Sequence, residues 1–350
     1  MLHIITPRHL TNSDELVGLM RMFVRQLPHA EHSIVVLGSE SDANWLRTIG
    51  IPVHGSIDGI DDVSQTLHHR FRNWVKKSAL NYSKILGWGF YSSSVASTFS
   101  EESDVYGFVD EIDETIHCGK GVRLLPTTMH CSNKLKSMGF LTRSIAEPLI
   151  GVEPTTLVLH RDQVFESLGL QLDSLVCSVI GRKSNPLEIV ELAVRMRTLN
   201  LEVHFILPRN YLFRTQLMRS ASSHGIRHCF HELPVYLRQQ DVCHAVHCIW
   251  CPSIAPFENS FCVLDVIAAA CKSTPFAVST QHPVSTMTSI GQQLTCAKDA
   301  SEMSAWIAKI SQNQTAYIAS ELESSVHPVH DFATPSRFIE GMQKRMDALV

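Results

Sequence analysis

Residues 175–183 read Leu-Val-Cys-Ser-Val-Ile-Gly-Arg-Lys, an apolar run that ends in a glycine and two cations. The segment Leu175–Ile180 has the length and the apolar, partly β-branched character of a buried strand. A helical pattern follows at Asn185–Leu199, and a second strand pattern follows at Val203–Leu207. Because strands that alternate with helices form βαβ units, these residues predict a parallel sheet.

The same alternation recurs on both sides of this segment. Before it, we expect strands at Leu2–Thr6, Ser33–Leu37 and Ile51–His54, with helices at Glu15–Gln26 and Asp42–Ile49. After it, we expect helices at Arg214–His224, Val263–Ala270 and Ser301–Ser311, with strands at Ala245–Trp250 and Phe276–Ser279. The sequence therefore predicts an α/β protein of two Rossmann-like domains that face a cleft at the carboxyl ends of their strands.

The length fits two domains, since 350 residues exceed one domain of about 150 residues. Pro148 and Pro154 punctuate the chain between the two alternating halves. We expect an N-terminal domain over 1–155, a C-terminal domain over 156–333 and an amphipathic helix within 334–350.

The composition narrows the class of protein. Lys and Arg number 30 against 34 Asp and Glu, and this net charge of −4 disfavours a nucleic-acid-binding protein. The longest purely apolar stretch, 266–271, is far shorter than the roughly 20 residues that cross a bilayer. The start of the chain also lacks the pattern of a secretory leader. We therefore expect a cytoplasmic protein with no nucleic-acid partner.

Charge is segregated in the middle of the first half. No acid occurs over 64–100, where Arg70, Lys76 and Lys77 accompany an apolar helical stripe, whereas 101–114 holds seven acids. One interpretation is a solvated helix face beside an acidic loop. The other is a basic amphipathic helix that contacts anionic lipid, at the inner face of a membrane, or a phosphorylated acceptor.

The chemistry is expected after two strands of the second half. Arg182 and Lys183 follow the strand at 175–180, where a guanidinium can bind phosphate oxygens. The segment 251–279 supplies a carboxylate at Glu258 and a helix start near Phe261, whose free backbone N–H groups suit a pyrophosphate. This combination is typical of a nucleotide-sugar site, although charges at the loop ends of an ordinary α/β domain give the same pattern.

These landmarks resemble the GT-B glycosyltransferases of the family 4 type. Arg161–Lys183 is similar to the start of their C-terminal domain, and Met129–Pro154 is similar to the segment before it. Pro252–Pro275 is similar to their Pro-Ser…Glu…Glu-Ala-x-Ala-x-Gly-x-Pro signature. In that fold a final helix crosses back to the N-terminal domain, although simple core packing explains the pattern at 334–350 equally well.

The resemblance implies transfer of a glycosyl group from a nucleotide sugar, with retention at the anomeric carbon, to a glycan or lipid-linked acceptor. It implies catalytic roles for Arg182 and Glu258, and donor-binding roles for Lys183, Asn259, Ser260, Phe261 and Asp265. No Asp-x-Asp triplet occurs, which favours a site without a metal. We expect no cofactor beyond the nucleotide-sugar co-substrate.

The sequence departs from the family pattern at several positions. Eight residues after Glu258 stands Val266, and the acid is Asp265 instead. One residue turns a helical side chain by about 100°, so ribose binding by this acid requires a different helix start. The departures leave two alternatives open: an inactive GT-B protein that binds a sugar, glycan or partner, and a nucleotide-sugar epimerase.

A Cys-x-x-Cys pattern at Cys248–Cys251 invites a metal or redox interpretation. It falls in an expected buried strand, where residues three apart point to opposite faces. We therefore expect structural thiols there. Dinucleotide, Walker and esterase motifs are absent from the sequence.

Overall fold

The computed structural model divides into two compact units. Unit 1 comprises Met1–Glu153, Cys262–Leu264 and Ala333–Val350, and unit 2 comprises Pro154–Phe261 and Asp265–Phe332. The structure describes residues 1–6, 14–26, 32–58, 65–78, 82–112, 116–149, 151, 160–209, 211–234, 237, 239–255, 266, 269, 274–279, 281, 299–312 and 334–348.

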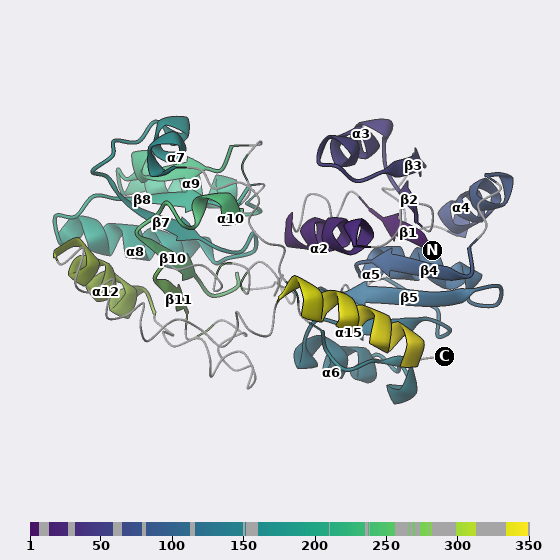
Figure 1. Cartoon of the computed structure of the whole chain (residues 1–350). Helices are drawn as coiled ribbons and strands as arrows, with labels where there is room; N and C mark the ends of the chain where they lie inside the picture. The colour runs from purple at the N-terminus through teal and green to yellow at the C-terminus, as the bar shows by residue number, and fades with distance from the viewer. Residues whose placement is uncertain are drawn as a thin grey trace. The chain divides into compact units, whose positions relative to one another are not determined.

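Unit 1 contains a six-stranded parallel sheet in the order β3-β2-β1-β4-β5-β6 (Figure 1). Its strands are β1 (Leu2–Ile5), β2 (Ser33–Val36), β3 (Val53–Ser56), β4 (Lys84–Trp88), β5 (Asp104–Val109) and β6 (Arg123–Pro126). Its helices are α2 (Asp14–Arg25), α3 (Glu40–Thr48), α4 (Gln65–Lys77), α5 (Phe90–Ala96), α6 (Met129–Ser137) and α15 (Pro335–Ala348), with 3-10 turns η2 (Ser97–Phe99) and η3 (Thr142–Ser144).

Both faces of this sheet are buried. In β5, Tyr106 and Phe108 belong to a core cluster that includes residues of α2, α3 and α15. Val105 and Val109 belong to a second cluster, with residues of α4, α5 and α6. Because neighbouring residues of one strand enter different cores, the helices cover both faces, as in a doubly wound α/β domain.

The strand β5 corrects the interpretation of 101–114 as an acidic loop. The segment Asp104–Val109 reads Asp-Val-Tyr-Gly-Phe-Val, and five of its six residues are buried. The acids lie at the ends of this apolar run, and a parallel strand covered on both faces needs no polar alternation. Arg72 of α4 forms an ion pair with Glu102, just before the strand.

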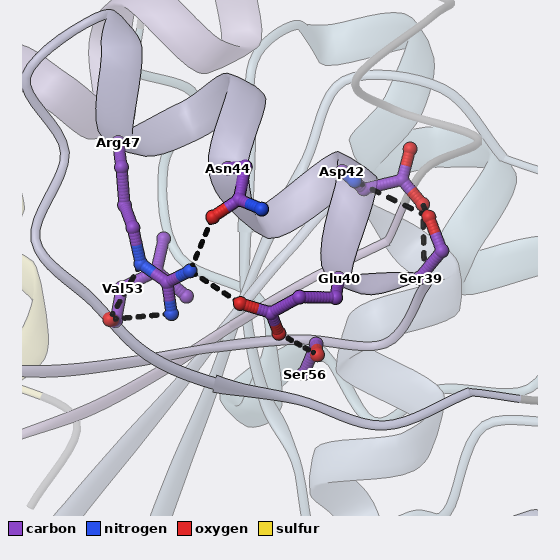
Figure 2. Close-up of polar contacts among 7 residues, drawn as sticks. All are labelled: Ser39, Glu40, Asp42, Asn44, Arg47, Val53 and Ser56. Atoms are coloured by element: carbon purple, nitrogen blue, oxygen red, sulfur yellow. Dashed lines mark hydrogen bonds and ion pairs between the residues drawn. The ribbon is translucent and has the colours of Figure 1, made fainter.

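Helix α3 begins at a reciprocal cap, which Figure 2 shows. Oγ of Ser39 accepts a hydrogen bond from the backbone N–H of Asp42 at 3.2 Å, and the carboxylate of Asp42 accepts one from the N–H of Ser39 at 2.9 Å. These bonds satisfy donors that a helix start leaves unpaired. The cap places the start of α3 at Glu40, two residues before the expected start.

Side chains of α3 also hold the edge strand β3 (Figure 2). Arg47 donates to Oε1 of Glu40 at 2.5 Å and to the carbonyl oxygen of Val53 at 3.3 and 3.4 Å. Oε2 of Glu40 accepts a hydrogen bond from Oγ of Ser56 at 2.7 Å. These bonds lower the pKa of Glu40, with Ser56 the larger cause and Arg47 the next.

Unit 2 contains a five-stranded parallel sheet in the order β11-β10-β7-β8-β9. Its strands are β7 (Leu175–Val179), β8 (Val203–Leu207), β9 (Phe230–Glu232), β10 (Cys248–Cys251) and β11 (Phe276–Val278). Its helices are α7 (Arg161–Leu168), α8 (Pro186–Thr198), α9 (Arg214–Ser223), α10 (Gln239–Val242) and α12 (Ala300–Gln312), with a 3-10 turn η4 (Arg227–Cys229). The helix expected at Val263–Ala270 lies mostly outside the described residues.

The final helix, α15, packs on unit 1. Phe338, Met342 and Met346 are buried in the core cluster of β5 and α2. The Tyr106 hydroxyl donates to the carbonyl oxygen of Met346 at 2.8 Å, and Nε of Arg345 donates to that of Glu147 at 2.8 Å. The last described residues of the chain are therefore part of the core of unit 1 (Figure 1, yellow).

None of the described helices has the length and hydropathy needed to span a membrane. In β10, Cys248 and Cys251 are both buried, and neither forms a disulfide bond.

We predict that Phe338→Ala lowers the free energy of unfolding of unit 1 by about 3–5 kcal/mol, because a fully buried ring leaves a cavity. Urea denaturation measures the loss. Gln343→Ala, at an exposed position of the same helix, is the matched control and should change this free energy by less than about 0.5 kcal/mol. Equal effects of the two substitutions would contradict the packing of α15 on unit 1.

We predict that Glu40→Gln lowers the urea midpoint at pH 7, and that the difference from the unsubstituted protein disappears in acid. The pKa of Glu40 in the folded protein lies below its ordinary value. Its contribution to the free energy of unfolding is therefore fully present above the unfolded pKa and is lost as the pH falls through the folded pKa. The midpoints of both proteins are measured across this range. A difference that persists unchanged at low pH would show that Glu40 does not act through its charge.

Candidate functional site

The candidate site lies where the chain reverses its direction across the sheet of unit 2. From β7 the chain proceeds through β8 to β9 on one side, and β10 then pairs with β7 on the other side. The loops after β7 and β10 therefore diverge at a topological switch point, which is where open parallel sheets bind ligands. This edge of the sheet is the candidate site.

The loop after β7 is a tight turn that carries two cations. Gly181 has φ +99°, and a Cβ there would lie 2.8 Å from Oγ of Ser184. Oγ of Ser184 donates to the carbonyl oxygen of Ile180 at 2.7 Å, which closes the turn. A residue with a side chain would be strained at 181, so glycine allows the turn. Arg182 and Lys183 lie at its tip and are half-buried.

The loop after β10 lies directly against this turn. The N–H of Ala255 donates to the carbonyl oxygen of Lys183 at 2.8 Å, and the N–H of Asn185 donates to that of Ser253 at 2.7 Å. An antiparallel bridge joins Ser184 and Ile254. The backbone of the two cations is therefore held by a second loop.

Glu188 of α8 clamps the loop after β10. One carboxylate oxygen, Oε2, accepts hydrogen bonds from the N–H of Ser253 at 2.7 Å and from its Oγ. Asn185 caps the same helix by accepting from the N–H of Leu187 at 3.1 Å, and its amide donates to Oγ of Ser253 at 3.4 Å. Ser253 is 3% exposed, so these bonds form away from bulk water.

The segment before α9 supports the other side of the turn. The N–H of Leu212 donates to the carbonyl oxygen of Arg182 at 3.0 Å, and the Tyr211 hydroxyl donates to that of Ser184 at 2.7 Å. Burial raises the pKa of Tyr211, which keeps this hydroxyl protonated as a donor. The carbonyl groups at 182, 183 and 184 thus all have partners, which fixes the direction of the backbone at both cations.

Gln239, at the start of α10, contacts the end of β7. Its Nε2 donates to Oγ of Ser178 at 2.5 Å and to the carbonyl oxygen of Val179 at 3.2 Å. Its Oε1 is buried and has no hydrogen-bond partner among the described residues. A buried acceptor without a partner is uncommon and suits a donor group from a ligand.

Unit 1 has a polar edge of its own at the carboxyl ends of its strands. Thr6 follows β1, Ser92 lies in α5 after β4, Asp110 follows β5 and Thr127 follows β6, and all four are buried. The hydroxyl groups of Thr6 and Ser92 have no partner among the residues that the structure describes. This edge can accept a ligand rich in hydroxyl groups.

The structure describes only part of the site expected from the sequence. Arg182 and Lys183 lie together on one turn at the carboxyl end of β7. The remaining expected residues lie outside the described residues; they are Glu258, Asn259, Ser260, Phe261 and Asp265. Their roles remain predictions.

Glu188, Ser253, Tyr211 and Gln239 were not expected from the sequence as parts of the site. The Asn-Pro-Leu-Glu start of α8 indicates a capped helix, but the principal partner of Glu188 stands 65 residues away. The spacing of neighbouring residues does not predict a contact over such a distance in the sequence.

The comparisons with known proteins agree with this fold. No family model matches the sequence, and a search of curated proteins finds no match. Among solved structures, Anabaena Alr3699/HepE in complex with UDP and glucose matches with a TM-score of 0.67 and 10% identity, over 99% of this chain and 100% of that chain. A glycosyltransferase from Rickettsia africae matches with a TM-score of 0.68 and 9% identity, over 99% of this chain and 97% of that chain.

A third match is a UDP-GlcNAc 2-epimerase from Neisseria meningitidis bound to UDP-GlcNAc. Its TM-score is 0.60 and its identity is 11%, over 99% of each chain. At such identities the likeness concerns the fold. The predicted fold class, with two Rossmann-like α/β domains of the GT-B type, is confirmed.

We predict that Glu188→Ala lowers the free energy of unfolding of unit 2 by about 1.5–3 kcal/mol, because hydrogen bonds to a charged acceptor are lost. Glu188→Gln keeps an acceptor and should lose less. Glu191→Ala is the control on the same helix, since Glu191 forms only an exposed i,i+4 pair with Arg195, worth about 0.3–0.5 kcal/mol. Urea denaturation measures all three, and a Glu188→Ala effect no larger than that of Glu191→Ala would contradict the clamp.

Proposed function

We propose that unit 2 binds the diphosphate of a nucleotide sugar at the turn 181–184, and that the chain transfers the glycosyl group to an acceptor. The observation that carries this proposal is the turn itself. Two adjacent cations stand on a backbone fixed by Ala255 and Leu212, at the switch point of the sheet. The backbone of such a turn need not rearrange when an anion binds to its cations.

The comparisons support the class of ligand. Alr3699/HepE, which shares this fold, was solved with UDP and glucose and also with UDP-glucose. Carboxyl ends of parallel strands at a switch point are common places for nucleotide binding. Gln239, with its unpartnered Oε1 beside the end of β7, is suited to accept a hydrogen bond from the bound nucleotide.

In the proposed reaction, the bond between the anomeric carbon and the diphosphate oxygen breaks and the oxygen keeps the electron pair. The guanidinium of Arg182, assisted by Lys183, stabilises the charge that develops on the diphosphate. A hydroxyl oxygen of the acceptor bonds to the anomeric carbon on the face that the diphosphate leaves, so the configuration is retained, and the hydroxyl proton passes to the departing diphosphate oxygen. The two cations take the place that a metal ion occupies in other sites for diphosphates.

The residues at 258–265 complete the proposed donor site. Glu258 orients the donor sugar, and Asn259, Ser260 and Phe261 contact the donor. Asp265 accepts a hydrogen bond from the ribose. The family resemblance supports these roles. We place the acceptor at unit 1, where Thr6 and Ser92 offer buried hydroxyl groups.

A binding protein without activity is the principal alternative. The displacement of the second acid to Asp265 favours it, because a shift of one residue along a helix turns a side chain by about 100° away from the ribose. The epimerase that shares the fold provides a further alternative for a nucleotide-sugar site. The epimerase keeps the diphosphate site and releases a different product, whereas the inactive protein binds a sugar, glycan or partner and forms no product.

We predict that UDP, GDP or ADP raises the melting temperature of the full chain. A ligand at 100 times its Kd adds about 2.7 kcal/mol of stability. Arg182→Ala should weaken this binding about 10- to 150-fold, the equivalent of about 1.5–3 kcal/mol for hydrogen bonds to a charged group. It should also abolish donor hydrolysis and transfer while leaving the fold intact.

Arg195→Ala is the matched control, because Arg195 lies on the neighbouring helix α8 and pairs with Glu191 at the surface. It should bind nucleotides as the unsubstituted chain does. Nucleotide binding without glycosyl transfer would favour the inactive binding protein, and release of an epimerised sugar would favour the epimerase. Unchanged binding in Arg182→Ala would contradict the proposed site.

A further inference from the structure

Three side chains with metal-binding atoms meet at the amino ends of β8 and β9, in unit 2. Glu202 precedes β8, and His228 and Cys229 belong to η4, directly before β9. Nε2 of His228 lies 3.5 Å from Sγ of Cys229 and 3.4 Å from Oε1 of Glu202. One such atom from each residue lies within 4.8 Å of the other two.

The separations match those of ligands around a tetrahedral zinc ion. Zinc binds Cys sulfur at about 2.3 Å, and His nitrogen or carboxylate oxygen at about 2.0–2.2 Å. At tetrahedral angles, these bond lengths place neighbouring ligand atoms about 3.3–3.6 Å apart. The observed 3.4 and 3.5 Å fall in this range. A thiolate with an imidazole favours zinc-class ions over magnesium or calcium.

Two similar turns hold the ligands in place. Two residues after helix α8 ends, Asn200 has φ +56°, and the N–H of Leu201 donates to the carbonyl oxygen of Met196 at 3.0 Å. Two residues after helix α9 ends, Gly225 has φ +66°, and the N–H of Ile226 donates to the carbonyl oxygen of Ala221 at 3.0 Å. Both are helix ends of the Schellman type, which fix the path of the chain into the next segment.

Arg197 joins these two turns. Its Nη1 donates to the carbonyl oxygen of His224 at 2.7 Å and to that of Gly225 at 3.4 Å. The turn that leads to Glu202 is thereby tied to the turn that leads to His228 and Cys229. The backbone segments that carry the ligands are therefore fixed before any ion binds, which reduces the ordering cost of binding.

Exposure and surroundings also suit an ion. The side chains of Glu202 and His228 are 63% and 62% exposed, whereas Cys229 is buried. An ion can therefore enter from solvent and still reach the thiol. Nε2 of His204 lies 3.7 Å from Oε1 of Glu202, and Nδ1 of His204 contacts Nε2 of His231 at 2.9 Å.

We propose that Glu202, His228 and Cys229 bind a divalent ion of the zinc class, with water in the remaining coordination position. The proposal is independent of the proposed function, because this site lies at the amino ends of the strands and the turn 181–184 lies at the carboxyl end of β7. The bound ion links the turn before β8 to the turn before β9. Its role is to stabilise this edge of unit 2.

The test is titration of the full chain with Co²⁺, which reports a thiolate ligand by ligand-to-metal charge-transfer absorption. We expect one ion bound with this absorption. Loss of one of three ligands in Cys229→Ser or His228→Ala should weaken binding by at least about 100-fold, the upper end of what loss of an outer partner costs. His224→Ala, at an exposed residue of the same segment, should bind as the unsubstituted chain does.

Absence of thiolate charge-transfer absorption in the unsubstituted chain would overturn the proposal. So would unchanged affinity in His228→Ala, whose exposed site tolerates the substitution even if Cys229→Ser fails to fold.

Discussion

The carboxylate of Glu188 joins the start of helix α8 to the loop after β10, two segments that lie far apart in the sequence. It accepts both the N–H and the hydroxyl of Ser253, 65 residues further along the chain. The loop after β10 then contacts the backbone of Lys183 and Asn185. The antiparallel bridge between Ser184 and Ile254 adds to this contact. The backbone that carries the two cations is therefore supported by a loop that a residue outside the turn holds.

The two ends of one sheet have different roles in this account. Chain reversal between β7 and β10 opens the carboxyl end of the sheet to a ligand. At the amino end, tight turns connect the helices to the strands of the sheet. The proposed ion links the turns before β8 and β9. A ligand-binding edge needs access for the ligand and fixed hydrogen-bond donors, whereas the amino end of the sheet needs only stable turns. An ion that stabilises the amino end therefore leaves the carboxyl end accessible to a ligand.

The sequence predicts what depends on local patterns. Val203–Leu207 has the same bounds as its expected strand, because a short apolar run between a helix and a loop leaves little choice. The strand Asp104–Val109 is buried on both faces, but the acids on either side of it make the sequence resemble a loop. The sequence predicts Arg182 at the end of a strand, because the glycine before it indicates a turn. Glu188 and Cys229 make contacts between segments that lie far apart in the sequence, and residue spacing does not predict such contacts.

Hydrogen–deuterium exchange of the full chain, with and without a saturating nucleoside diphosphate, tests the central claim most directly. The account predicts slower exchange at the backbone amides of 181–185 and 252–255, where two loops meet at the switch point of unit 2. Exchange that slows only elsewhere in the chain, or a nucleotide that leaves these amides unchanged, would contradict it.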